Sequence, residues 1–240
     1  MTSRAAFVAG ATGYVGRALV RVLVERGWRT VAHLRPDSPE RDTWRVRFAG
    51  MGATADATPW DADAMAATLL SVQPTAVFAL LGTTRQRARA SAARGQADGY
   101  EHVDYGLTAL LLRATQRAAR EMDASPRFVY LSSVGADAAS RNPYLAVRGR
   151  LEAELRASPL PWTVVRPSFI TGPDRDESRP AERIGATLVD AALAIPGLLG
   201  AHRLRDRWRS TTADELARAL ARLAEDPRAD GAVVEGDGLR

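Results

Sequence analysis

Short apolar runs alternate with longer amphipathic segments along most of this chain. The apolar runs that have the length of buried strands span residues 4–9, 29–34, 75–81, 127–131 and 162–166. The segments with helical spacing of apolar positions span residues 14–26, 61–71, 100–121 and 144–157. A strand followed by a helix, repeated in this way, is typical of βαβ units. The pattern therefore predicts an α/β fold, with a doubly wound, mostly parallel sheet and helices on both faces.

The rest of the chain is patterned less clearly. A strand near residues 52–55 is only weakly indicated because the stretch is rich in glycine and alanine. Residues 211–225 return to a helical pattern, and residues 232–235 form a last apolar run. Residues 168–209 contain several glycines and prolines, which predicts a small C-terminal region on the substrate side. At this length we expect residues 1–240 to form one domain.

Arginine supplies all of the positive charge, because the 33 basic residues include no lysine, and cysteine is absent as well. The lack of cysteine excludes disulfides, zinc–thiolate sites and a thiol nucleophile. The net charge of +5 comes from arginines interspersed with acidic residues, a pattern typical of solvated surfaces. The arginine-rich stretch at residues 85–94 contains no stacking aromatic residue, so we expect no nucleic-acid partner.

The N-terminus runs directly into the first predicted strand, which leaves no room for a secretory signal. No apolar run approaches the roughly 18 residues of a membrane span. These observations predict a cytoplasmic protein that has no membrane partner.

The segment GATGYVG, residues 10–16, lies between the first predicted strand and the first predicted helix. Glycines there allow a tight turn, a close approach of bare backbone to a pyrophosphate, and close packing of helix on strand. The helix N-terminus then offers free N–H groups to the phosphates. This placement predicts the dinucleotide loop of a Rossmann fold. The candidate cofactor-binding residues are Gly10, Thr12, Gly13, Tyr14, Val15 and Gly16.

Arg35 follows the second predicted strand, where the fold distinguishes between the two nicotinamide cofactors. A carboxylate at this place binds the ribose hydroxyls of NAD, whereas a guanidinium can bind the 2′-phosphate of NADP and stack on adenine. The sequence therefore favours NADPH. Asp37, two residues later, leaves NADH possible, and an ordinary solvated loop end is the alternative for Arg35.

Two further strand ends offer polar groups to a cofactor. Asp56 follows the third predicted strand, where a carboxylate can accept from the adenine amino group, although an aspartate in a simple turn fits equally well. Leu81, Gly82 and Thr83 end the fourth strand, where the chain passes close beneath the cofactor. A glycine permits that close approach, and the threonine can bond to ribose or phosphate.

Tyr144 and Arg148 are one helical turn apart, so both lie on one face of the predicted helix. Ser132 and Ser133 stand at the carboxyl end of the preceding strand. In a reductase a phenol supplies a proton to the nascent alkoxide, a nearby cation lowers the pKa of that phenol, and a serine orients the carbonyl. The predicted catalytic residues are Ser133, Tyr144 and Arg148, and the last two are also predicted to contact the cofactor.

The glycine loop, the strand-end serines and the Tyr-x-x-x-basic helix together resemble the short-chain dehydrogenase/reductase superfamily, in its atypical or extended branch. A narrower resemblance, over residues 80–185, rests on LGTTR, SSVGAD, the Arg166–Pro167 pair and DRDESRP. These segments are similar to the Tat-interactive-protein-like oxidoreductases, which are small NADPH-binding Rossmann proteins. The resemblance implies that Tyr144 is the proton donor with Ser133 as its partner. It also implies that Pro167 and Arg179 lie against the cofactor or substrate, unless Arg179 forms only a loop salt bridge.

Arg148 stands where that family has lysine. Because the chain contains no lysine at all, we interpret the exchange as a general preference for arginine rather than a lost active site. The leading hypothesis is an NADPH-dependent oxidoreductase that reduces a small carbonyl substrate. A non-catalytic NAD(P)H-binding sensor is the alternative. A sugar epimerase or dehydratase is a further alternative, but the segment after residue 166 is short for a nucleotide-sugar domain.

A homodimer is also possible in this superfamily, through helices 100–121 and 144–157. Its apolar contacts would come from Leu107, Leu111, Leu151 and Leu155. The alternative is that these leucines cover the sheet.

Overall fold

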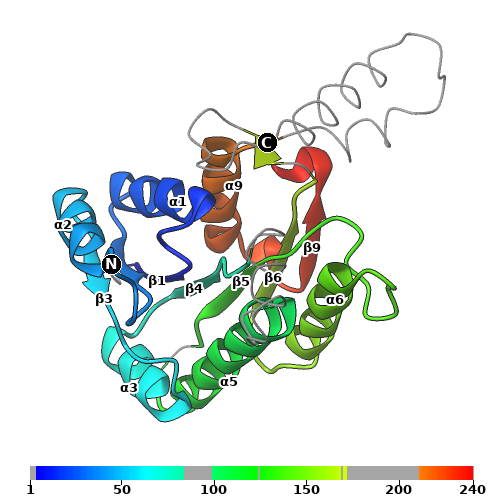
Figure 1. The fold of residues 1–240 in the computed structure, drawn as a ribbon, viewed down its shortest axis with the longest axis horizontal. Helices are drawn as coiled ribbons and strands as arrows, with labels where there is room; N and C mark the ends of the chain where they lie inside the picture. The colour runs from blue at the N-terminus through cyan, green and yellow to red at the C-terminus, as the bar shows by residue number, and fades with distance from the viewer. Residues whose placement is uncertain (1–3, 84–98, 124, 169, 172–210, 240) are drawn as a thin grey trace, which may run out of the picture.

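A parallel sheet forms the centre of the protein (Figure 1). The computed structural model describes residues 4–83, 99–123, 125–168, 170–171 and 211–239. Within these ranges a seven-stranded sheet has the order β3-β2-β1-β4-β5-β6-β9, and neighbouring strands pair in parallel. The strands are β1 (Ala5–Ala9), β2 (Arg29–His33), β3 (Thr54–Asp56), β4 (Ala76–Ala79), β5 (Arg127–Leu131), β6 (Trp162–Arg166) and β9 (Ala232–Glu235). A separate short pair joins β7 (Ile170–Thr171) to β8 (Thr211–Thr212). The prediction of a doubly wound α/β fold is therefore confirmed.

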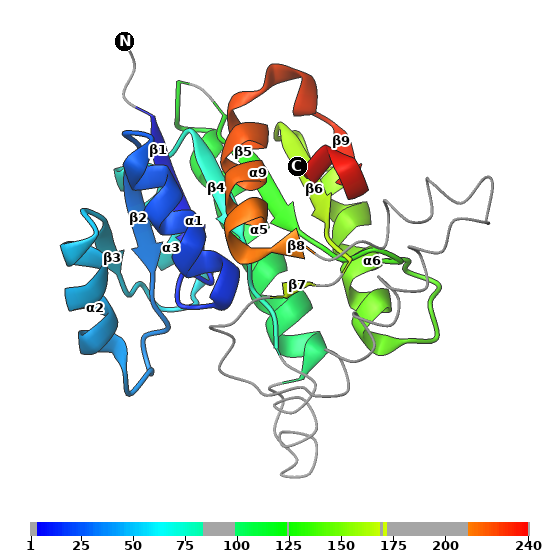
Figure 2. The same ribbon diagram turned by 90° about the horizontal axis from the view of Figure 1, so that it is seen from above.

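Helices cover both faces of the sheet (Figures 1 and 2). One face carries α1 (Tyr14–Glu25) and α9 (Ala213–Glu225), and the other carries α3 (Ala62–Val72), α5 (Thr108–Ala119) and α6 (Pro143–Arg156). Each strand contributes to both cores, because its side chains point alternately to the two faces. In β1, for example, Val8 packs with the first group of helices and Phe7 with the second.

Two elements differ from the sequence prediction. Helix α2 (Arg41–Gly50) was not predicted, because it is largely polar and buries only Trp44 and Phe48, one turn apart. Strand β3 begins two residues later than expected, at Thr54, where it pairs with Val31–His33 of β2. The glycine and alanine of this stretch carry little pattern, so pairing with β2 determines the register.

The predicted helix 100–121 is divided into two parts. A π-helix, η1 (Tyr100–Leu107), leads into α5. The wider turn changes which residues face the interior, and Asp104 is buried as a result. Short π-helical segments occur often at functional sites.

The proposed dimer contacts are wrong for three of the four leucines. Leu111, Leu151 and Leu155 are each 0% exposed and pack in the core against the sheet. The apolar face of each helix is used to cover the sheet, so it is not available to a second copy. A homodimer remains a prediction that needs other contacts. The predicted substrate-side region, residues 168–209, lies outside the described residues apart from positions 168, 170 and 171.

Candidate active site

The sheet brings several loops together at the carboxyl ends of its strands. Strands β1 and β4 are neighbours, and the chain proceeds outward from them in opposite directions. In such sheets ligands bind at the carboxyl ends of the strands where the order reverses. The glycine loop follows β1, Leu81–Thr83 follow β4, and the two serines follow β5.

The glycine loop has the geometry that a pyrophosphate site needs. Gly10 has φ of 82°, and a Cβ there would lie 2.6 Å from the carbonyl oxygen of Leu80. A Cβ on Gly16 would lie 2.1 Å from the carbonyl oxygen of Gly10. Gly13 is the N-cap of α1 and forms no side-chain cap, so no side chain blocks the first N–H groups of the helix there. The loop therefore fits a bound dinucleotide.

The other predicted residues of the glycine loop differ in how far their side chains are buried. Thr12 and Tyr14 are half-buried, whereas the side chain of Val15 packs in the core. Val15 is thus suited to contact a cofactor through its backbone but not through its side chain.

Arg35 is exposed directly after β2, as predicted. Its Nε lies 3.2 Å from Oδ1 of Asp37, and the two side chains are 59% and 78% exposed. A surface pair of this kind contributes at most about 1 kcal/mol, so a phosphate can displace the carboxylate.

Asp56 forms a turn at the end of β3. Its carboxylate accepts hydrogen bonds from the N–H of Thr58 at 3.0 Å and from the Thr58 hydroxyl at 2.9 Å. These bonds favour the simple turn over adenine recognition as the role of this residue.

His33 lies beside that turn and is buried. Its Nε2 donates to the carbonyl oxygen of Thr58 at 2.9 Å and lies 3.8 Å from Oδ2 of Asp56. Burial lowers the pKa of His33, and the opposing effects of Thr58 and Asp56 are smaller.

This lowered pKa predicts sensitivity to acid. Below about pH 6.5 the unfolded chain takes up a proton that native His33 resists, so the free energy of unfolding should decrease as the pH falls. The decrease should be up to about 1.4 kcal/mol per pH unit, the limit for one proton. Urea denaturation at neutral pH and near pH 5 measures it. The slope should flatten in His33→Gln and persist in His102→Gln, which changes an exposed histidine. An unchanged slope in His33→Gln would contradict this assignment.

The segment after β4 is tied to η1. Oδ2 of Asp104 accepts from the N–H of Thr83 at 2.8 Å, and its Oδ1 accepts from Nη2 of Arg148, also at 2.8 Å. A Cβ on Gly82 would lie 3.0 Å from that Nη2, so a larger residue there would require the guanidinium to shift by a few tenths of an ångström. Leu81 is half-buried and packs against the core.

Arg148 is 6% exposed and directs its donors into the protein. Besides the bond to Asp104, its Nη1 donates to the carbonyl oxygen of Leu131 at 2.6 Å. The guanidinium carbon lies 4.6 Å from the centre of the Tyr144 ring. The Nε has no hydrogen-bond partner among the described residues. The sequence analysis predicted that Arg148 contacts the cofactor, whereas here two of its donors bind the end of β5 and Asp104 of η1.

The Arg148–Asp104 pair is the buried charge centre of the site. Burial by itself would lower the pKa of Arg148, but Tyr144, Tyr130 and Asp104 together outweigh it. The pKa is therefore raised overall, and the guanidinium stays charged. Burial raises the pKa of the Asp104 carboxyl, and Arg148 opposes that shift. Burial likewise raises the pKa of Tyr130 to about 12, which keeps that phenol neutral. Asp104 is thus the carboxylate that balances Arg148.

Tyr144 lies in the first turn of α6, on the same face as Arg148. The N-cap of the helix is Asn142, whose Oδ1 accepts from the N–H of Tyr144 at 3.0 Å. The ring is half-buried and meets Tyr100 of η1 edge to face, with centroids 5.4 Å apart. The aromatic and cationic neighbours hold the ring in one place.

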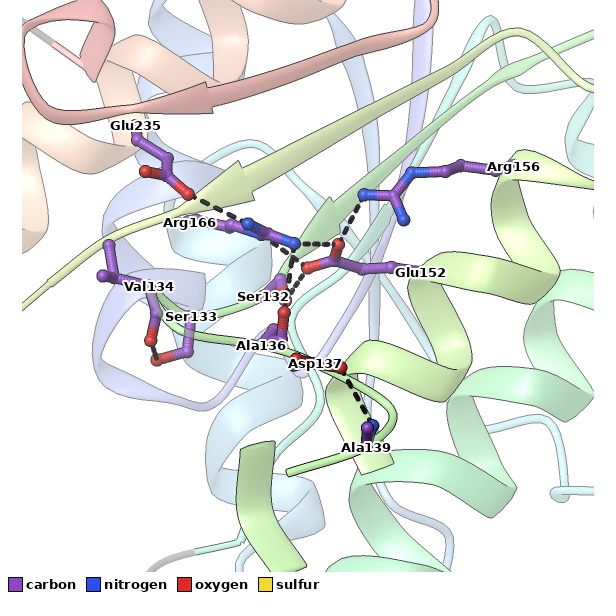
Figure 3. Close-up of polar contacts among 10 residues, drawn as sticks. All are labelled: Ser132, Ser133, Val134, Ala136, Asp137, Ala139, Glu152, Arg156, Arg166 and Glu235. Carbon is purple, nitrogen blue, oxygen red and sulfur yellow. Dashed lines mark hydrogen bonds and ion pairs between the residues drawn. The ribbon is translucent and has the colours of Figure 1, made fainter. Parts of the chain in front are cut away.

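The two strand-end serines have different surroundings (Figure 3). Ser132 is buried and donates to Oε1 of Glu152 at 2.6 Å. Ser133 is half-buried, and among the described residues its hydroxyl donates one hydrogen bond, to the carbonyl oxygen of Val134 at 3.3 Å. Ser133 is therefore the more accessible of the two serines, and its contact with a substrate stays a prediction.

The sequence analysis missed three residues that shape the site: Asp104, Gly149 and Glu152. A Cβ on Gly149 would lie 2.2 Å from the backbone nitrogen of Ala138, so the loop after β5 lies directly on α6. Glu152 follows Arg148 by one helical turn, and this spacing was the available signal. Pro167 is buried, and its carbonyl oxygen accepts from the N–H of Val134 at 3.1 Å. Arg179 lies outside the described residues.

Comparison with known proteins identifies the family. The model of an NAD(P)H-binding family matches residues 10–192 of the chain. The chain belongs to this family. Its resemblance to atypical members of the short-chain dehydrogenase/reductase superfamily is confirmed, and the cofactor is of the nicotinamide type.

The chain matches its curated relatives over most of their length. "Protein fmp52, mitochondrial" of Aspergillus fumigatus is 34% identical over 222 residues, which cover 88% of this chain and 82% of the relative. The FMP52 protein of Debaryomyces hansenii is 27% identical over 236 residues, covering 97% and 94%. Both relatives are named mitochondrial, which contradicts the predicted cytoplasmic location. That prediction tested only for a secretory signal and a membrane span, and neither of these reports on mitochondrial import.

Solved structures share the fold at lower identity. An oxidoreductase of the short-chain dehydrogenase/reductase family from Burkholderia thailandensis has a TM-score of 0.71 at 21% identity, covering 99% of this chain and 92% of that one. UDP-glucose 4-epimerase from Brucella ovis, in complex with NAD, has a TM-score of 0.67 at 18% identity, covering 98% of this chain and 78% of that one.

None of the described helices is long and apolar enough to cross a membrane.

Proposed function

We propose that this protein is an NADPH-dependent reductase of small carbonyl compounds, with Tyr144 as the proton donor. The observation that carries the proposal is the arrangement on α6. Tyr144 is held there by the buried cation Arg148, and Ser133 stands on a loop packed against the same helix. A family built to bind NAD(P)H supplies the context.

The roles follow from the positions of the groups. The bound cofactor would supply a hydride to the carbonyl carbon, and its pyrophosphate would lie at the Gly10–Gly16 loop. Ser133 would donate a hydrogen bond that orients the carbonyl oxygen. Tyr144 would give its phenolic proton to that oxygen as charge develops there. Arg148 would act by its fixed positive charge, because a guanidinium does not release a proton.

Turnover of a substrate panel tests the proposal directly. Purified protein and NADPH, mixed with aldehydes, ketones and quinones, should oxidise NADPH in step with loss of the carbonyl compound. A product analysis that shows the corresponding alcohol or hydroquinone would identify the reaction.

Arg35 provides a separate prediction about the cofactor. NADPH should bind more tightly than NADH by about 1–3 kcal/mol, the value of a charge-assisted hydrogen bond. Arg35→Ala should remove most of the difference, measured by calorimetry with both cofactors. Asp37→Asn serves as the matched variant, because it removes the present partner of Arg35 and should strengthen NADPH binding. Equal affinities for both cofactors in the parent protein would contradict the preference.

A cofactor sensor without turnover is the second candidate. It is favoured by the internal bonds of Arg148 to Leu131 and Asp104, since a guanidinium used in this way contributes fewer donors to a cofactor. Tight NADPH binding together with no turnover on any carbonyl compound of the panel would support this candidate over the reductase.

A further inference from the structure

Glu152 is a buried carboxylate on α6, outside the residues assigned above to the reaction. Its side chain is 0% exposed. Oε1 accepts from the hydroxyl of Ser132 at 2.6 Å and from Nε of Arg166 at 2.8 Å. Oε2 accepts from Nη2 of Arg166 at 2.5 Å and from Nη2 of Arg156 at 2.8 Å. Figure 3 shows the two arginines reaching the carboxylate from different sides.

These bonds join parts of the chain that are distant in sequence. Ser132 follows β5, Arg166 ends β6, and Glu152 lies on α6. Arg166 also binds Glu235, the last residue of β9, at 3.0 Å. We call Ser132, Glu152, Arg156, Arg166 and Glu235 the Glu152 cluster.

The cluster reaches the loop that carries Ser133. Nη2 of Arg166 donates to the carbonyl oxygen of Ala136 at 3.2 Å. Ser132, bonded to Glu152, immediately precedes Ser133. The loop is therefore held at both sides of Ser133, by bonds that end on one carboxylate or on its arginine partner.

The same helix carries the proton donor. Tyr144, Arg148 and Glu152 succeed one another at intervals of four residues, so they form one stripe along α6. One end of the stripe presents the phenol and the other holds the serine loop.

We propose that Glu152 is a positioning residue, which holds Ser133 in register with Tyr144 through Ser132 and Arg166. The inference rests on the proposed reductase function for its kinetic consequences, but not for its structural ones. Bidentate arginine–carboxylate bonds fix orientation as well as distance, which suits this role. Glutamine at position 152 would present an amide N–H₂ to the surrounding donors and so lose half of the acceptors.

Hydrogen exchange tests the structural part without any substrate. In Glu152→Gln, the amides of Val134, Ala136 and Asp137 should exchange about tenfold faster, the factor expected for one lost bond to a charged group. Ser132→Ala, a milder change, should raise exchange in the same loop. Glu154→Gln is the matched control, because Glu154 lies on α6 but binds Tyr105 and leaves the loop untouched. Unchanged loop exchange in a folded Glu152→Gln protein would overturn the proposal.

A double-mutant cycle tests the kinetic part. Glu152→Gln should lower kcat about tenfold and leave the dissociation constant for NADPH within about twofold. In a Ser133→Ala background the same change should cost almost nothing more, since the group it positions is gone. If instead the double variant loses kcat by the product of the two single losses, Glu152→Gln causes a general structural defect, and the positioning role is overturned. If the parent reduces no carbonyl compound, the reductase proposal fails and the exchange measurement alone decides the role of Glu152.

Discussion

Replacing Tyr144 by phenylalanine is expected to lower carbonyl reduction at least about a hundredfold while NADPH affinity is unchanged. A hundredfold loss is the usual scale for a positioned general acid. Phenylalanine keeps the ring that contacts Arg148 and Tyr100, so the local packing should persist and only the transferable proton is removed. Steady-state kinetics with the best substrate of the panel, together with calorimetry for NADPH, measures both quantities.

Tyr105→Phe is the matched control for that variant. Tyr105 lies on η1, and its hydroxyl donates to Glu154 rather than facing Arg148 or the serine loop. This variant should keep nearly the full rate. Parent-like turnover in Tyr144→Phe would remove this tyrosine from the mechanism.

The second large effect concerns stability. Asp104→Ala should lower the free energy of unfolding by about 3–5 kcal/mol, the usual cost of leaving a buried charge without its partner. Arg148 cannot neutralise itself, because a guanidinium stays protonated. The variant also loses the bond from the N–H of Thr83, so the segment after β4 should loosen and NADPH binding should weaken. Urea denaturation and cofactor titration measure the two losses.

The chain contains a matched exposed pair. Arg150 and Glu101 lie on the same two helices, α6 and η1, and their atoms are also 2.8 Å apart, but the side chains are 43% and 65% exposed. Glu101→Ala should therefore cost no more than about 1 kcal/mol. Asp104→Leu combined with Arg148→Met should recover much of the stability lost in Asp104→Ala, since no unpaired charge remains. Equal losses in Asp104→Ala and Glu101→Ala would show that burial does not set the strength of the inner pair.

Local features of the site could be predicted from the sequence because they depend on neighbours in the chain. The glycine loop is one case: its spacing, and its position between a strand and a helix, require Gly10 and Gly16 for steric reasons that the structure reproduces. The shared face of Tyr144 and Arg148 is another, since it follows from helical periodicity alone. Boundaries of strongly patterned strands, such as Arg127–Leu131 and Trp162–Arg166, were predicted for the same reason.

The tertiary structure alone decided which groups of different elements meet. Helical spacing places Arg148 and Glu152 on one face, but it does not specify what that face meets. The partner of Arg148 is Asp104, 44 residues earlier, and a π-helix without a clear sequence signal turns it inward. Glu152 binds Ser132, so the first of the two adjacent serines is buried in a structural bond while Ser133 stays half-buried. Sequence determined the faces of the elements through their periodicity, whereas packing against other elements determined which charges and hydroxyls are paired and which remain available for chemistry.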